Sequence, residues 1–266
     1  MGKIAQEMNL AESAFILKSE RADFRARYFT PAVEIPMAGH PTLSVIFALI
    51  HAHKIKLDDY PVNVTLEVKA AILPIEIQSK NGELLSITMQ QIKPKFLEIV
   101  RQEEVLPVFG LQEIDFTKDV PIQIVSTGTN QLMVPVKDIE TLERIVLNVD
   151  AFANLRARYD FMSIHAFTVH GYTQTGDTYA RHFDIPPDLI EDPFTGSATG
   201  GMAAYLWRYH LIDESQFIAE QGHTMGRPGQ AEVLIIGKRE NIEGIKVGGK
   251  VVLVAEGVIY VDEPSH

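Results

Sequence analysis

The hydrophobic residues of this chain follow two different periodicities. Apolar and polar residues alternate over many short stretches, as where Phe24, Ala26 and Tyr28 share one face, and this alternation predicts strands. Residues 42–53 and 197–211 are instead apolar around most of the helical circumference, which is typical of buried helices. The pattern therefore favours a mixed α/β fold in which strands surround a few helices.

The remaining elements follow from the same periodicities. Strands are predicted at residues 12–19, 22–30, 62–69, 72–78, 84–91, 122–128, 131–136, 161–169, 178–184, 216–222, 231–237, 244–249, 250–257 and 258–262. Helical segments are predicted at residues 2–10, 96–105 and 139–159.

The chain carries one motif twice. "EIPMAGHPTLSVIFALI" spans residues 34–50 and "EDPFTGSATGGMAAYLW" spans residues 191–207, an offset of 191 − 34 = 157 residues. The pairs that match without a gap include Glu34 and Glu191, Pro36 and Pro193, Gly39 and Gly196, and Thr42 and Thr199. "ARYF" precedes the first copy and "ARHF" the second. We therefore expect two domains of one design, related by a pseudo-twofold axis, each with strands wrapped around a central helix.

Each copy places a glycine, Gly39 or Gly196, at the start of a predicted buried helix. The first N–H groups of a helix lack internal partners, and together with the helix dipole they attract anions. Two such helix starts facing one another would hold a carboxylate or stabilise an enolate-like charge. The alternative is that Thr42 and Ser197 only cap their helices.

The two copies differ at the position after the shared glycine, where His40 of the first copy corresponds to Ser197 of the second. The chain has no cysteine, so proton transfer would require other groups. His40 exchanges a proton near neutral pH, and Asp192 occurs only in the second copy. Glu12 is a further candidate acid or base, although its position alone equally fits a solvated loop glutamate.

Composition narrows the functional classes. The chain has 266 residues, 46% hydrophobic and 22% charged, and a net charge of −11, which is typical of a globular protein that does not bind nucleic acid. The absence of cysteine excludes disulfides, thiolate zinc sites and cysteine nucleophiles. No apolar run is long enough to predict a membrane-spanning helix, and no secretory signal is visible, so we expect a cytoplasmic protein. His51 and His53 are candidate metal ligands, but histidines at the end of a helix more often interact with the helix dipole.

Several motifs together resemble the phenazine-biosynthesis protein F (PhzF-like) family, within the diaminopimelate-epimerase-like superfamily. They are "EMNLAESAF", "RYFTPAVEIPMAGHPTL", "EDPFTGSATGGMAAYL" and "EQGHTMGRPG", and the resemblance extends over nearly the whole chain. It implies two pseudo-symmetric α/β domains, each a barrel-like, mostly antiparallel or mixed sheet around one helix, with the active site between them. We assign residues 1–95 to the first domain and 96–266 to the second, with the last strand returning to the first domain.

The resemblance also implies roles for individual residues. Glu12 corresponds to the family's proton shuttle, His40 and Asp192 to its partners in catalysis, and Gly39, Gly196 and Ser197 to substrate-binding positions. The implied activity is a cofactor-independent isomerisation of a small carboxylate-bearing metabolite by acid–base proton transfer, without metal, in a homodimer. The alternatives are an epimerase or racemase of a related acid and a non-catalytic binder of small anions.

The beginning of the chain departs from the family pattern. Family members usually have a further strand and a Gly-Asn-Pro turn ahead of the helix with which this sequence starts. We therefore expect the first domain to lack one strand at the edge of its sheet, where unpaired backbone groups favour aggregation. This departure leaves the activity of the chain as it stands open.

Overall fold

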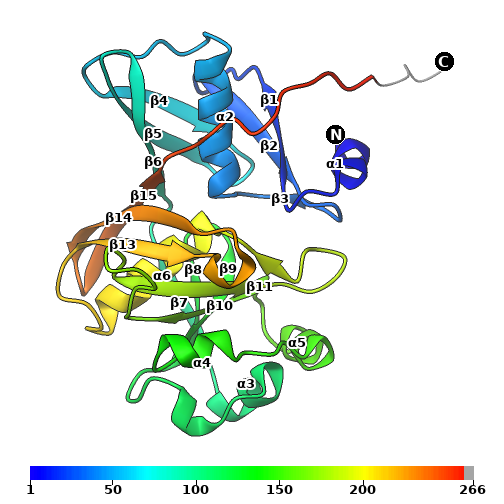
Figure 1. Ribbon diagram of the computed structural model, residues 1–266, viewed down its shortest axis with the longest axis vertical. Coiled ribbons are helices and arrows are strands. Elements are labelled where there is room, and N and C mark those ends of the chain that lie inside the picture. Colours follow the sequence, from blue (N-terminus) through cyan, green and yellow to red (C-terminus); the bar gives the residue numbers. More distant parts are fainter. Residues whose placement is uncertain (261–266) are drawn as a thin grey trace.

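The computed structural model describes residues 1–260 and forms two halves stacked along its long axis (Figure 1). The helices are α1 (Gly2–Met8), α2 (His40–His51), α3 (Gln102–Phe109), α4 (Ile139–Glu143), α5 (Val149–Arg156) and α6 (Gly196–Arg208), with short 3₁₀ turns at Glu113–Asp115 and His223–Met225. No helix within residues 1–260 is both long and apolar enough to cross a membrane.

The strands form one continuous, strongly bent sheet. Its strands in chain order are β1 (Ser13–Leu17), β2 (Phe24–Phe29), β3 (Glu34–Ile35), β4 (Val62–Glu67), β5 (Ile72–Lys80), β6 (Glu83–Gln91), β7 (Lys95–Val100), β8 (Ile122–Ser126), β9 (Asn130–Pro135), β10 (Ser163–Thr168), β11 (Thr178–Phe183), β12 (Glu191–Asp192), β13 (Gln216–Gln221), β14 (Gly229–Lys238) and β15 (Asn241–Gly249). Hydrogen bonding connects them in the order β1-β2-β4-β5-β6-β15-β14-β13-β11-β10-β9-β8-β7, with β3 on β2 and β12 on β11.

The two halves repeat the same pairing scheme. In the first, β1–β2 is antiparallel, β2–β4 parallel, and β4–β5 and β5–β6 antiparallel. In the second, β10–β11, β11–β13, β13–β14 and β14–β15 repeat these directions in the same sequence. The antiparallel pair β6–β15 joins the halves. The predicted duplication is confirmed at the level of topology.

An arginine–glutamate pair closes the corresponding hairpin in each half. Arg27 binds Glu34 through two parallel hydrogen bonds of 2.9 and 2.8 Å, and Arg181 binds Glu191 through two of 2.8 Å. The planar guanidinium matches the carboxylate geometry in both places. These fixed hairpins lead directly into α2 and α6, so the same local design positions both helix starts.

Three hydrophobic cores support the site. The first half packs around α2, whose buried Val45, Ile46 and Leu49 face the sheet. In the second half one core surrounds α6, and another lies between the opposite face of the sheet and α3, α4 and α5 (Figure 1). Burial along nearly its whole length explains the apolar circumference of α6, whereas α2 exposes Ser44, Ala48 and His51 along one face.

Three predicted elements, the helix at 96–105 and the strands at 250–257 and 258–262, differ from the structure. The helix expected at 96–105 is strand β7 up to Val100, and α3 begins only at Gln102. A short apolar run is compatible with either state, and pairing with β8 decides for the strand. Residues 250–260 form no strand, and residues 261–262 of the last predicted strand lie outside the described residues.

The end of the described chain nevertheless runs along the first half. Val251 packs against the core around α2, and Glu256 lies 3.3 Å from Nε2 of His51. Strand β1 ends the sheet order on this side. The division into domains at residue 95 stays a prediction.

Candidate active site

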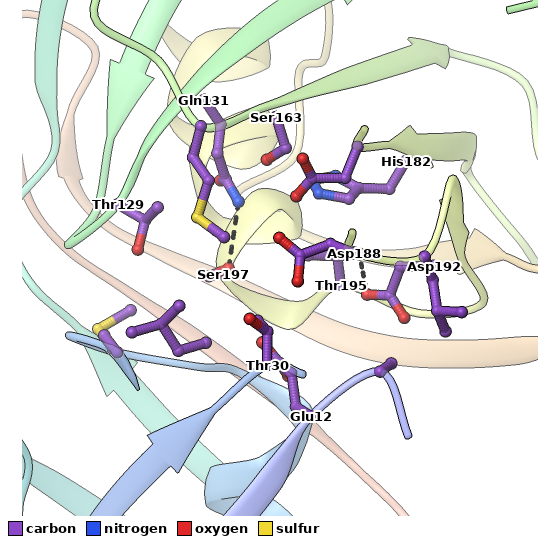
Figure 2. A pocket seen from close by; sticks show the side chains of 16 residues that line it. Glu12, Thr30, Thr129, Gln131, Ser163, His182, Asp188, Asp192, Thr195 and Ser197 are labelled. Carbon is purple, nitrogen blue, oxygen red and sulfur yellow. Dashed lines mark hydrogen bonds between the residues drawn. The ribbon is translucent and has the colours of Figure 1, made fainter. Parts of the chain in front are cut away.

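A small cavity of about 60 Å³ lies between the two halves. Glu12 and Thr30 enter it from the first half, and Asp192, Thr195 and Ser197 enter it from the second (Figure 2). Polar side chains of the two halves therefore meet at one cavity at the junction, beside apolar residues such as Ile35 and Met37.

The six residues singled out from the sequence gather at this junction, although not all of them line the cavity. Glu12, Asp192 and Ser197 are in its wall. His40 borders it through Glu12, with its Nε2 atom 3.3 Å from Oε2 of that carboxyl group. Gly39 and Gly196 lie behind the wall, where the starts of α2 and α6 meet.

The two glycines permit a direct backbone contact between the halves. A Cβ atom built on Gly39 would lie 2.6 Å from Cα of Gly196 and 2.6 Å from the backbone nitrogen of Ser197. Only a residue without a side chain allows such an approach. The sequence predicts these glycines as part of anion-binding helix starts, whereas the structure uses Gly39 to bring the two helix starts together.

Replacement of Gly39 by Ala should lower the free energy of unfolding by about 1–3 kcal/mol, because the added methyl group meets backbone atoms that cannot rotate away. Gly39 has φ −77°, which alanine adopts freely, so the change reports the contact and not backbone strain. Urea denaturation measures the effect. Gly257→Ala is the matched control, since no atom lies within 4 Å of its added Cβ. Equal midpoints for the two variants would contradict the close contact.

Glu12 is placed by the turn between α1 and β1. The helix ends at Asn9, which has a left-handed backbone conformation, and β1 begins at the residue after Glu12. The side chain of Glu12 is only 19% exposed. Burial raises its pKa to about 7, the nearby His40 opposes this, and the carboxylates of Asp192, Asp188 and Asp184 reinforce it. A carboxyl group with this pKa both accepts and releases a proton near neutral pH.

Asp192 is fixed by its own loop. Its Oδ2 atom accepts a hydrogen bond from the Thr195 hydroxyl, and its carbonyl accepts one of 2.6 Å from Nε2 of Gln221. The Oδ1 atom of Asp192 is buried without a partner among the described residues. The same is true of Oδ1 of Asp188, which also lines the cavity. These free acceptor atoms suit a ligand that donates hydrogen bonds or carries a positive charge.

Polar side chains from both halves secure the start of α6. Gln91 of β6 donates a 2.7 Å hydrogen bond to the carbonyl of Gly196, and Thr127 donates one of 3.1 Å to the carbonyl of Ser197. The Ser197 hydroxyl accepts a 3.3 Å hydrogen bond from Nε2 of Gln131 (Figure 2). Side chains of both halves therefore hold the start of α6 in place.

Sequence reasoning missed much of the cavity wall. The additional polar lining residues are Thr30, Thr129, Gln131, Ser163, His182, Asp184, Asp188 and Thr195. Two signals were available: the "ARHF" motif replaces a tyrosine by His182, and Asp184, Asp188 and Asp192 recur at intervals of four residues. Burial raises the pKa of Asp184 to about 7, and Arg156, 3.1 Å away, acts in the opposite direction. The site thus contains several carboxyl groups, two of which titrate near neutrality.

This arrangement supports acid–base chemistry. Glu12, a group able to carry a proton, lies on one side of the cavity. Hydrogen-bond acceptors without a partner among the described residues, Oδ1 of Asp188 and Oδ1 of Asp192, lie on the other side. Proton transfer between positioned groups requires little beyond alignment, exclusion of water and stabilisation of the developing charge. Among residues 1–260 no cluster of three or more histidine or carboxylate side chains has the geometry of a metal site.

Over most of its length the chain is similar to one protein family and to proteins named as isomerases. The family model described as "Phenazine biosynthesis-like protein" matches residues 1–257. An uncharacterized isomerase of Bacillus subtilis, YfhB, is 34% identical over 232 residues, which are 86% of this chain and 78% of the relative. Trans-2,3-dihydro-3-hydroxyanthranilate isomerase of Pseudomonas aeruginosa is 30% identical over 264 residues, 98% of this chain and 88% of the relative.

A solved structure shares the fold over the same length. The crystal structure of the Bacillus anthracis phenazine biosynthesis protein of the PhzF family superposes with a TM-score of 0.85 at 33% sequence identity. The match covers 98% of this chain and 88% of that chain. The overall fold is therefore common to this chain and its structural relative.

Proposed function

The chain belongs to the phenazine biosynthesis-like protein family and is an isomerase, and we propose that it moves a proton between carbon atoms of a small carboxylate-bearing substrate. Glu12 is the proposed carrier, taking a proton from one carbon and returning it to another. The observation that carries this proposal is the carboxyl group of Glu12, withdrawn from water at the cavity wall, with a pKa raised to about 7.

The proposed roles of the other residues follow from their positions. His40, 3.3 Å from Glu12, exchanges hydrogen bonds with the carrier as its charge changes. The starts of α2 and α6 attract the substrate carboxylate, since their first N–H groups lack partners within the helices. Asp192 accepts a hydrogen bond from the substrate, and Ser197 offers its hydroxyl. This proton transfer uses side chains alone and needs no metal or organic cofactor.

The relative from Pseudomonas aeruginosa suggests the first substrate to test. Its name specifies trans-2,3-dihydro-3-hydroxyanthranilate, a ring acid with a carboxylate, an amino group and a hydroxyl group. We propose an acid of this general class for the present chain, because free carboxylate oxygens of Asp188 and Asp192 suit an amino substituent. A homodimer and a cytoplasmic location remain predictions from the sequence.

The proposal is tested by incubating the chain with trans-2,3-dihydro-3-hydroxyanthranilate and following the products by NMR and mass spectrometry. Movement of a double bond at constant mass in ordinary water is the expected result. Inversion at one carbon with the double bonds in place would identify an epimerase instead. Binding without conversion, measured by calorimetry, would identify a binder of small acids and contradict the proposed isomerisation of this substrate class.

A further inference from the structure

Two buried histidines form a pair that the proposed proton transfer does not yet use. His165 on β10 and His182 on β11 are direct register partners, and their Nδ1 atoms lie 3.2 Å apart. Asp192 on β12 is in turn the register partner of His182. Directly opposed residues of antiparallel strands point to the same face of a sheet. The three side chains therefore form a row across three strands that ends at the cavity.

The two rings differ in what their second nitrogen meets. His165 is fully buried, and its Nε2 atom is sealed from solvent without a partner among the described residues. His182 is 5% exposed and lines the cavity, pointing into it from β11 (Figure 2). Its Nε2 atom has no hydrogen-bond partner among these residues but is not sealed, so it opens toward the cavity.

Both rings are neutral near neutral pH. Burial lowers the pKa of His182 to about 4 and that of His165 well below its ordinary value, and the proximity of His182 lowers that of His165 further. The carboxylates of Asp192 and Glu191 raise the pKa of His182 and His40 lowers it, but burial is the largest influence. Each ring therefore carries a single N–H group.

The position of that N–H group follows from the sealed nitrogen. If His182 donated its Nδ1–H to His165, the only N–H of His165 would be at Nε2, buried without an acceptor. If His165 donates its Nδ1–H, only a bare Nε2 is sealed, and His182 carries its hydrogen on the nitrogen that opens to the cavity. Buried N–H groups without an acceptor are rarer than under-satisfied acceptors in protein interiors. The hydrogen bond made by one ring nitrogen selects the tautomer of the other.

We propose that His182 is a further substrate-contacting residue, a neutral Nε2–H donor aimed into the cavity, and that His165 is the positioning residue that fixes this tautomer. The role toward substrate rests on the proposed function, whereas the tautomer does not. Removing a proton from carbon moves negative charge onto the conjugated oxygen of the substrate. A preorganised neutral donor stabilises that charge without releasing a proton of its own.

The tautomer can be measured without any substrate. Two-dimensional ¹H–¹⁵N NMR of the ¹⁵N-histidine-labelled full chain distinguishes protonated from bare ring nitrogens. We expect His182 to be protonated at Nε2 and bare at Nδ1, and His165 to show the opposite, at pH 7. An Nδ1–H form of His182, or a doubly protonated ring, would overturn the proposal.

Matched variants test the positioning role. In His165→Asn the amide N–H can still donate to Nδ1 of His182, so the Nε2–H signal of His182 should persist. In His165→Leu the donor is lost, and His182 should become a mixture of tautomers. A His182 spectrum that is the same in both variants would show that His165 does not fix the tautomer of His182.

Turnover of trans-2,3-dihydro-3-hydroxyanthranilate tests the contact with substrate. His182→Leu should lower kcat roughly ten-fold through the lost hydrogen bond, and His182→Gln, which retains an N–H donor, should recover most of this loss. Equal kcat for His182→Leu and the wild-type chain would overturn the contact. If the wild-type chain does not convert this compound, the proposed function fails for it, while the NMR result still decides the tautomer and its cause.

Discussion

Replacing Glu12 by Gln is expected to reduce turnover by a factor on the order of a hundred or more while changing substrate affinity little. The amide has nearly the shape of the protonated carboxyl group, so it fills the same part of the cavity wall beside His40. It cannot accept and return a proton. Loss of kcat at a preserved Kd is therefore the signature of a proton carrier, as opposed to a residue that only shapes the cavity.

Glu7→Gln provides the matched control, because Glu7 lies on the preceding helix with an exposed side chain. It removes one carboxyl group near the same turn and should retain wild-type kcat. Kd is obtained by calorimetry and kcat from initial rates on trans-2,3-dihydro-3-hydroxyanthranilate. Wild-type turnover by Glu12→Gln would remove Glu12 from the mechanism.

The same substitution is expected to stabilise the fold at alkaline pH. The pKa of Glu12 is about 7 in the folded chain and 4.5 as its reference value, so the folded state binds more protons between these values. The free energy of unfolding of the wild-type chain should then fall as pH rises through this window. At about 1.4 kcal/mol for each pKa unit, the loss reaches up to about 3 kcal/mol above pH 7.

Glutamine remains neutral throughout and avoids this loss. Glu12→Gln should match the wild-type chain near pH 4.5 and exceed its stability by up to about 3 kcal/mol at pH 8. Urea denaturation at both pH values measures the difference, with Glu7→Gln as reference. A stability difference that does not change with pH would show that Glu12 has no raised pKa in the folded state.

Much of the fold could be predicted because local pattern and global duplication agree. The apolar circumference of α2 and α6, and the motif repeated before each, were enough to predict two halves of one topology. Residues 96–100 were misassigned because Phe96, Ile99 and Val100 fit a helix or a strand equally, and only the distant partner β8 decides. Residues 250–260 have the apolar, valine-rich composition of a strand, but a strand requires a neighbour, and none is paired with them in the described structure.

The site was predictable only where residues share a motif. Glu12, His40, Asp192 and Ser197 belong to quoted motifs, and the structure brings them to one junction. Gln91, Gln131 and His165 could not be identified, because each is an ordinary strand residue whose role depends on a distant segment. That segment is the start of α6 for the two glutamines and strand β11 for His165. The role of Gly39 was also hidden, since helix–helix contact and ligand access both call for a residue without a side chain.

The central claim is that Glu12 carries a proton from one carbon of the substrate to another, and isotope uptake tests it most directly. The wild-type chain and Glu12→Gln are incubated with trans-2,3-dihydro-3-hydroxyanthranilate in D₂O, and the position of deuterium is read by NMR. Because a partly exposed carboxyl group exchanges its proton with solvent, wild-type product should carry deuterium at the carbon that receives the proton, and Glu12→Gln should yield almost none. Equal deuterium incorporation by the two proteins would contradict the claim.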